Sequence, residues 1–217
     1  MSDGYAFDGL PLEAIRPGTS VLVSGPTHAG TRNLALRMLD GGDAEASIIV
    51  TTNQRAARLA EDCERVGFDI DPGRVAVVDC VGEEDEDVAA RVVPVSGPAD
   101  LTGIGMRYSK LSREFKSDGF DRVRTGVVSV STLVSFGELR SVARFIHTMV
   151  GHINSIDGLG VLFIDPSTHD ERTVNTLAQF CGGRIEVRDG ENGPELRARG
   201  LADQPREWTS FDPTSER

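Results

Sequence analysis

The sequence contains almost no lysine and no long apolar run. Of its 23 basic residues all but Lys110 and Lys116 are arginines, and 34 acidic residues give a net charge of -11. A strongly acidic surface repels a phosphate backbone, which disfavours nucleic acid as a general partner. We expect no membrane span and no secretory signal, because no apolar run is long enough to cross a bilayer and the first residues, MSDGYAFDG, are neither basic nor apolar. The expected location is therefore the cytoplasm.

The shortage of lysine also indicates the kind of organism in which the protein works. An acidic, lysine-poor surface suits a cytoplasm at very high salt, where charge repulsion is screened and solubility depends on strong hydration. We therefore expect a halophilic protein; the alternative is an ordinary acidic protein from a GC-rich genome, where Arg codons replace Lys codons. The three cysteines, Cys63, Cys80 and Cys181, are far apart and form no C-x-x-C pair, which favours reduced thiols over a disulfide or zinc site.

Apolar runs alternate with helical patterns along most of the chain, which favours an α/β fold with a mostly parallel sheet flanked by helices. We expect one domain over residues 1–201 and a polar tail over residues 202–217, with Trp208 and Phe211 as anchors. The acidic run at 83–87 is expected to be a solvated loop. A C-terminal β-hairpin is predicted around the turn DGENG. The predicted strands are 20–24, 47–51, 74–79, 126–130, 160–164, 184–188 and 195–199, and the predicted helices are 31–39, 54–66, 100–115, 138–153 and 170–181.

The stretch GPTHAGTR, residues 25–32, lies between a predicted strand and a predicted helix. Gly25 and Gly30 have the spacing of the phosphate-binding pattern G-x-x-x-x-G-K-[ST], but Thr31 stands in place of Lys and Arg32 in place of Ser or Thr. Backbone N–H groups and a helix N-terminus can still attract an anion. The candidate nucleotide-binding residues are therefore Gly25, Thr27, Gly30, Thr31 and Arg32, with ATP or ADP as the only cofactor considered and no metal expected.

The layout resembles the RecA-type P-loop ATPases and, among them, a KaiC-like group of archaea that includes a haloarchaeal branch. The stretches that carry the resemblance are RPGTSVLVSGPTHAGTRNLALRML, ADLTGIGMRYSKL, GVVSVSTLV and GGRIEVRDGENGPELRARGL. Together they cover roughly residues 9–201. The resemblance implies a RecA-like fold, in which hydrolysis depends on a phosphate-loop Lys, a Mg²⁺-binding hydroxyl, an acidic residue that polarises water, and a Walker B Asp.

Each of these four positions is altered in this chain. Thr31 carries no charge, and Arg32 cannot bind a cation. The stretch IIVTTNQ places Asn53 and Gln54 where the acidic residue belongs, and amides are not bases at neutral pH. GVVSVS places Ser129 at the Walker B position. No catalytic residue is therefore expected, because hydrolysis needs metal, charge neutralisation and water positioning together.

Two aspartates could restore a metal site, because Asp79 and Asp165 each follow an apolar strand. In a RecA-like strand order we expect the strand that carries Ser129 to lie beside the phosphate-loop strand, which makes both aspartates turn or helix-capping residues instead. A different strand order would instead make Asp79 a candidate metal ligand.

The sequence thus predicts a regulatory or signalling-associated pseudo-ATPase that acts by binding a protein partner or itself, with or without residual nucleotide binding. One alternative is a slow Mg²⁺-dependent ATPase that uses Asp79 or Asp165. The other is a structural subunit that binds no nucleotide.

Overall fold

The computed structural model describes residues 4–82 and 88–214, so the acidic loop predicted at 83–87 lies outside the described residues. One nine-stranded sheet runs through the molecule in the order β4-β3-β2-β5-β6-β1-β7-β8-β9. The first seven strands along the chain pair in parallel, and the last two are antiparallel. The strands are β1 (Thr19–Ser24), β2 (Ala46–Thr51), β3 (Val75–Asp79), β4 (Arg91–Pro94), β5 (Val123–Val128), β6 (Leu159–Ile164), β7 (Gly183–Gly190), β8 (Gly193–Arg199) and β9 (Thr209–Ser210).

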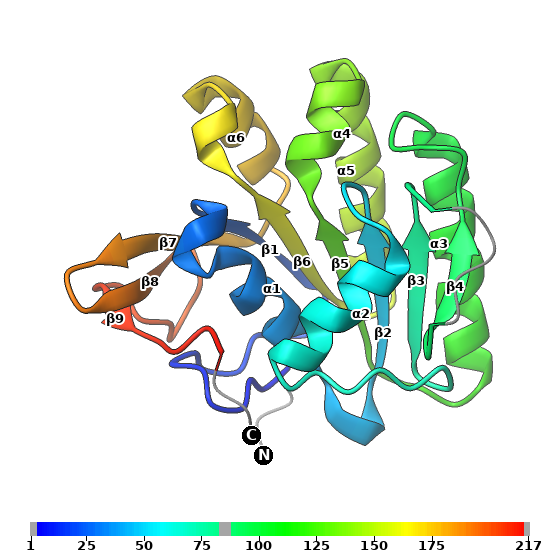
Figure 1. The fold of residues 1–217 in the computed structure, drawn as a ribbon, viewed down its shortest axis with the longest axis horizontal. Coiled ribbons are helices and arrows are strands. Elements are labelled where there is room, and N and C mark those ends of the chain that lie inside the picture. The colour runs from blue at the N-terminus through cyan, green and yellow to red at the C-terminus, as the bar shows by residue number, and fades with distance from the viewer. Residues whose placement is uncertain (1–3, 83–87, 215–217) are drawn as a thin grey trace.

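Helices cover both faces of the sheet, as the near-continuous apolar strands predict. In Figure 1, α1 and α2 lie in front of the sheet and α3 and α5 lie behind it. Two apolar cores follow from this arrangement: α1 and α2 pack on one face with the N-terminal segment, while α3, α4, α5 and α6 pack on the other. The α-helices are α1 (Thr31–Leu39), α2 (Ala56–Arg65), α3 (Leu101–Ser117), α4 (Val130–Phe136), α5 (Leu139–Ser155) and α6 (Glu171–Ala178), and the 3-10 turns are η1 (Thr27–Ala29), η2 (Gly42–Ala44) and η3 (Pro166–Thr168).

The order of the central strands differs from the expected one. The strand beside β1 is β6, with Ser24 opposite Ile164. β5, which leads to Ser129, lies one strand further away and pairs with β6 and β2. The prediction that the Ser129 strand adjoins the phosphate-loop strand was therefore wrong. Strand order depends on long-range pairing, which the apolar pattern of a single strand does not encode.

The C-terminal hairpin is confirmed: β7 pairs antiparallel with β8, and Arg184 lies opposite Arg199. The tail then adds β9, which pairs with β8. Trp208 lies against two arginines of the hairpin, with the guanidinium carbons of Arg188 and Arg197 4.2 and 4.3 Å from its ring centroids. Phe211 is buried. Both aromatic residues anchor the tail, as predicted.

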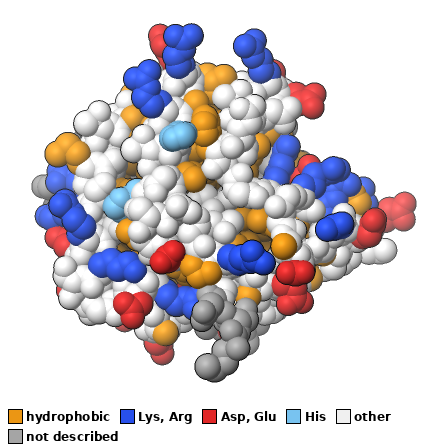
Figure 2. All heavy atoms as spheres, turned by 180° about the vertical axis from the view of Figure 1, so that it is seen from behind, with side chains coloured by type: hydrophobic (Ala, Val, Ile, Leu, Met, Phe, Trp, Pro, Cys, Tyr) orange, Lys and Arg blue, Asp and Glu red, His pale blue; other side chains and the backbone are white. Residues whose placement is uncertain are grey.

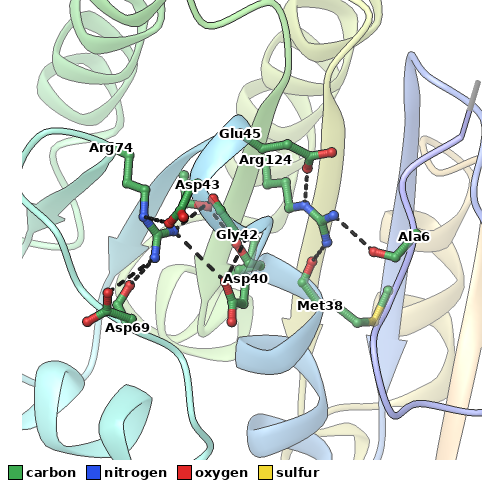
Figure 3. Close-up of polar contacts among 11 residues, drawn as sticks. Ala6, Met38, Asp40, Gly42, Asp43, Glu45, Asp69, Arg74 and Arg124 are labelled. Carbon is green, nitrogen blue, oxygen red and sulfur yellow. Dashed lines mark hydrogen bonds and ion pairs between the residues drawn. The ribbon is translucent and has the colours of Figure 1, made fainter. Parts of the chain in front are cut away.

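Two buried arginines, Arg124 and Arg74, hold together the end of the sheet where the central strands begin (Figure 3). Arg124 of β5 is almost fully buried, and its Nε lies 2.5 Å from Oε2 of Glu45. Its two other nitrogens donate to the carbonyls of Met38, at the end of α1, and Ala6, in the N-terminal segment. Arg74 donates in the same way to the carbonyls of Gly42 and Asp69. These two guanidinium groups therefore tie several separate segments to the sheet.

Candidate functional site

The stretch 25–32 forms the connection between β1 and α1. Residues Thr27–Ala29 make a single 3-10 turn, in which the Ala29 N–H donates to the carbonyl of Pro26 over 3.1 Å. Gly30 then has a φ of 76°, in the left-handed region that glycine adopts without strain. The strand–loop–helix context required of a phosphate loop is present, and α1 begins and ends where the sequence predicted.

Thr31 turns back into this loop. Its side chain is fully buried, and its hydroxyl donates to the Pro26 carbonyl over 2.7 Å. A Cβ at Gly25 would lie 2.6 Å from this hydroxyl oxygen and 2.6 Å from the carbonyl of Val187 in β7. Gly25 is therefore needed for close packing around the folded-in threonine. The hydroxyl fastens the loop to itself and leaves no cationic group at the position where a lysine would meet phosphate.

Asp165, at the end of β6, binds the loop directly. Its Oδ2 accepts hydrogen bonds from the backbone N–H and the hydroxyl of Thr27, each over 3.0 Å. Its Oδ1 accepts from the N–H and hydroxyl of Ser167. Partial burial alone would raise the pKa of Asp165, but the hydrogen bonds from Ser167 and Thr27 outweigh it and hold this pKa below its ordinary value. The loop thus already holds an anion, supplied by the neighbouring strand.

Arg32 points away from the loop, toward α2. Its Nε lies 3.4 Å from Oδ2 of Asp62, and its side chain is 14% exposed. The side-chain amide of Gln54 donates to the same carboxylate oxygen over 2.9 Å. Asp62 also pairs with Arg58 and Arg65 on its own helix. Two of the candidate positions, Arg32 and Gln54, are therefore engaged by one buried carboxylate that sequence reasoning missed.

The remaining candidate positions have structural roles or face solvent. Ser129 is buried and caps the start of α4, because its hydroxyl accepts a hydrogen bond from the N–H of Ser131. Its backbone N–H and carbonyl both bond to the hydroxyl of Thr52. Asn53, next to Thr52, is exposed. Ser129 and Thr52 thus fasten the end of β5 to the end of β2.

Asp79 is a capping residue, as expected. It is 2% exposed. Its Oδ2 accepts from the N–H of Ala56 at the start of α2 over 2.7 Å. Its Oδ1 accepts from the N–H groups of Val81 and Gly82 in the turn that follows β3. The carboxylate therefore stabilises a helix start and a turn, and β3 is separated from β6 by β2 and β5 in the sheet.

The C-terminal tail covers one side of the loop. A Cβ at Gly30 would lie 2.6 Å from Cβ of Pro213, so the tail packs directly on this glycine. Arg37 of α1 holds the tail there by donating to the carbonyl of Asp212 over 2.6 Å. The N–H of Phe211 donates to the Pro194 carbonyl. The loop thus contacts β6 through Asp165 and the tail through Pro213, while Thr27 and His28 stay exposed.

Within residues 4–82 and 88–214, no group of three or more His, Cys, Asp or Glu side chains has the arrangement of a metal site. In the same part of the chain, no helix combines the length and apolar character needed to cross a bilayer. The groups available to a ligand at the loop include backbone N–H groups, the Thr27 hydroxyl, the exposed His28 side chain and the Asp165 carboxylate.

The position of the loop is predictable from the sequence, but the residues that surround it are not. The contact between Asp165 and Thr27 depends on the adjacency of β1 and β6, and the contact between Arg32 and Asp62 depends on how α1 packs near α2. An aspartate that directly follows an apolar strand was the available signal for the first contact. No local pattern distinguishes Asp62 from the other acidic residues of α2.

Comparison with known proteins gives a fold and a family. No curated protein matches the sequence. Among solved structures, the fold is similar to that of the KaiC-like protein PH0186 from the hyperthermophilic archaeon Pyrococcus horikoshii OT3, with a TM-score of 0.66, 16% sequence identity, and coverage of 99% of this chain and 95% of that one. This likeness shows the KaiC-like RecA fold. The model of a family of unknown function, DUF7504, matches residues 18–187, so the chain belongs to that family.

Proposed function

We propose that this protein is a KaiC-like pseudo-ATPase that does not hydrolyse ATP and acts in regulation or signalling by binding a protein partner. The observation that carries the proposal is that polar groups of the loop are already engaged by other residues of the chain. Thr31 bonds to Pro26, Asp165 takes the N–H and hydroxyl of Thr27, and Arg32 is paired with Asp62. A triphosphate bound here would meet the Asp165 carboxylate beside Thr27, and it would find no lysine of the kind that P-loop NTPases present to phosphate.

Asp165 disfavours both phosphate and Mg²⁺ at this site. The negative charge of Asp165 repels phosphate, and its lowered pKa keeps it ionised at neutral pH. The hydrogen bonds from Thr27 and Ser167 also occupy both carboxylate oxygens. Binding Mg²⁺ through Asp165 would require these bonds to break, which weakens the case for a slow ATPase that uses this residue. Asp79 is equally engaged by three backbone N–H groups.

Turnover of ATP tests the proposal. With Mg²⁺ and millimolar ATP, phosphate release by the full chain is expected to equal that of a protein-free control, because the loop lacks its lysine, Arg32 is paired with Asp62, and both oxygens of Asp165 already accept hydrogen bonds. The matched variants are Asp165→Asn and Asp79→Asn, which remove one charge each. Mg²⁺-dependent release by the wild-type protein that Asp165→Asn or Asp79→Asn abolishes would contradict the proposal and establish the ATPase alternative.

A further inference from the structure

A groove lies between α3 and α5 on the face of the sheet opposite α1 and α2. The two helices run in the same direction: Gly105 lies near Phe145, and further along the Ser112 hydroxyl is 3.2 Å from Nε2 of His152. The groove has a volume of about 540 Å³, and its lining includes Leu101, Gly105, Met106, Arg113, Arg144 and Phe145. It lies away from the phosphate loop.

The groove has a largely apolar surface, and a smaller cavity adjoins it. Met106 is 69% exposed, which is unusual for a large apolar side chain in this protein. Beside it, a smaller cavity of about 60 Å³ is lined by residues that include Tyr108, Phe145, Met149 and His152. Burial and the nearby Arg113 lower the pKa of His152, which favours the neutral imidazole. This cavity suits the end of one aliphatic side chain.

The charge around the groove has the opposite sign to that of the whole protein. α3 carries four basic residues and one acidic residue, and α5 carries two basic residues and no acidic one, whereas the chain as a whole has a net charge of -11. Of the described residues that line the groove, only Arg113 and Arg144 are charged. Among the described residues, neither forms an ion pair. Figure 2 shows this face, where Lys and Arg side chains (blue) lie around apolar ones (orange).

We propose that the α3–α5 groove binds an acidic amphipathic helix of a partner protein. The apolar side chains of such a helix would lie on Met106 and Phe145, with one side chain in the small cavity, and its carboxylates would pair with Arg113 and Arg144. Helices bind in grooves of this kind through apolar residues spaced three or four positions apart. The charge reversal selects an acidic partner over a basic one. This inference rests on the proposed function, because it names the surface through which protein binding occurs.

The test uses a designed helical peptide of about 16 residues, or about four turns, with leucines along one face and glutamates elsewhere. A peptide of the same pattern with lysines in place of glutamates is the control. Binding to the full chain is measured by fluorescence anisotropy, at a salt concentration where circular dichroism shows the protein folded. We expect saturable binding of the acidic peptide only, weakening as KCl increases because its ion pairs are exposed.

Three single-residue variants locate the site. Met106→Glu and Arg144→Glu should each weaken binding of the acidic peptide at least about tenfold, because one places a charge on the apolar floor and the other reverses a rim charge. Arg58→Glu, on α2 across the sheet, reverses another exposed charge and should leave binding unchanged. All three positions are exposed, so the variants should fold.

Several results would overturn the inference. These are no binding of the acidic peptide at millimolar concentration, equal binding of the lysine peptide, or equal loss in all three variants. A dimer in solution that Met106→Glu dissociates would show that the groove holds a second copy. Binding to anionic vesicles through the same residues would show that it faces lipid. None of these results depends on ATP turnover, so failure here and failure of the pseudo-ATPase proposal can be distinguished.

Discussion

Replacing Arg124 by alanine is expected to lower the free energy of unfolding by about 3–5 kcal/mol, the usual cost of removing one partner of a buried ion pair. Glu45 is 7% exposed and would lose its 2.5 Å partner. The carbonyls of Met38 and Ala6 would each lose a donor. The guanidinium also lies 5.4 Å from the ring centroids of Tyr5 and Phe7, so the N-terminal segment would lose packing.

Denaturant unfolding followed by circular dichroism measures this loss. Arg122→Ala is the matched control, since Arg122 pairs with the same Glu45 over 3.0 Å but is 33% exposed. We expect the control to cost less than Arg124→Ala, because Arg122 is more exposed than Arg124 and the bonds to Met38 and Ala6 remain. Equal losses in the two variants would contradict a special role for the buried guanidinium. The double variant Arg124→Met/Glu45→Met should recover part of the loss, because both charges of the most buried pair are removed together and only the partly exposed Arg122 loses its partner.

Restoring the phosphate-loop residues with Thr31→Lys/Arg32→Thr should not by itself produce tight ATP binding. The new lysine would supply the missing positive charge, but Asp165 would still hold the Thr27 N–H and compete with phosphate. Adding Asp165→Asn removes the repulsive charge. We expect the triple variant to bind ATP with a dissociation constant at least about tenfold lower than the double variant, a difference of about 1.4 kcal/mol or more.

The control for this comparison is Asp170→Asn added to the same double variant. Asp170 caps α6 and lies in the same connection, between β6 and α6, but it contacts Thr173 and not the loop. It should leave ATP affinity nearly unchanged. If adding Asp165→Asn to the double variant also left ATP affinity unchanged, the carboxylate would not oppose phosphate, and the closure of the loop would depend on Thr31 and Arg32 alone.

Much of the fold could be predicted from local patterns. The apolar runs, the paired glycines and the turn residues located β1, α1 and the hairpin closely. β4 was missed because it is a short, half-buried strand at the edge of the sheet, with a proline at its end. The strand predicted at 126–130 is instead β5, Val123–Val128, because the charged Arg124 hid its beginning from an apolar pattern.

The chemistry of the site could be predicted only in part. The substitutions at Thr31, Arg32 and Ser129 were visible in the sequence, but their contacts were not. Asp165 was interpreted as a capping residue, and it does cap η3. Its second role, at the loop, follows from the placement of β6 beside β1, which local pattern does not reveal. The substitutions can be read from the sequence, but contacts between distant segments determine whether the polar groups of the loop are free or already bonded.

The most direct test of the closed loop is calorimetric titration of the wild-type protein with ATP, with and without Mg²⁺, in about 0.2 M and about 2 M KCl to span weak and strong screening. We expect no saturable heat up to millimolar ATP and no effect of Mg²⁺, because the loop N–H of Thr27 is already bonded to Asp165 and the loop lacks its lysine. Micromolar binding that Mg²⁺ strengthens would contradict this account and identify a working nucleotide site.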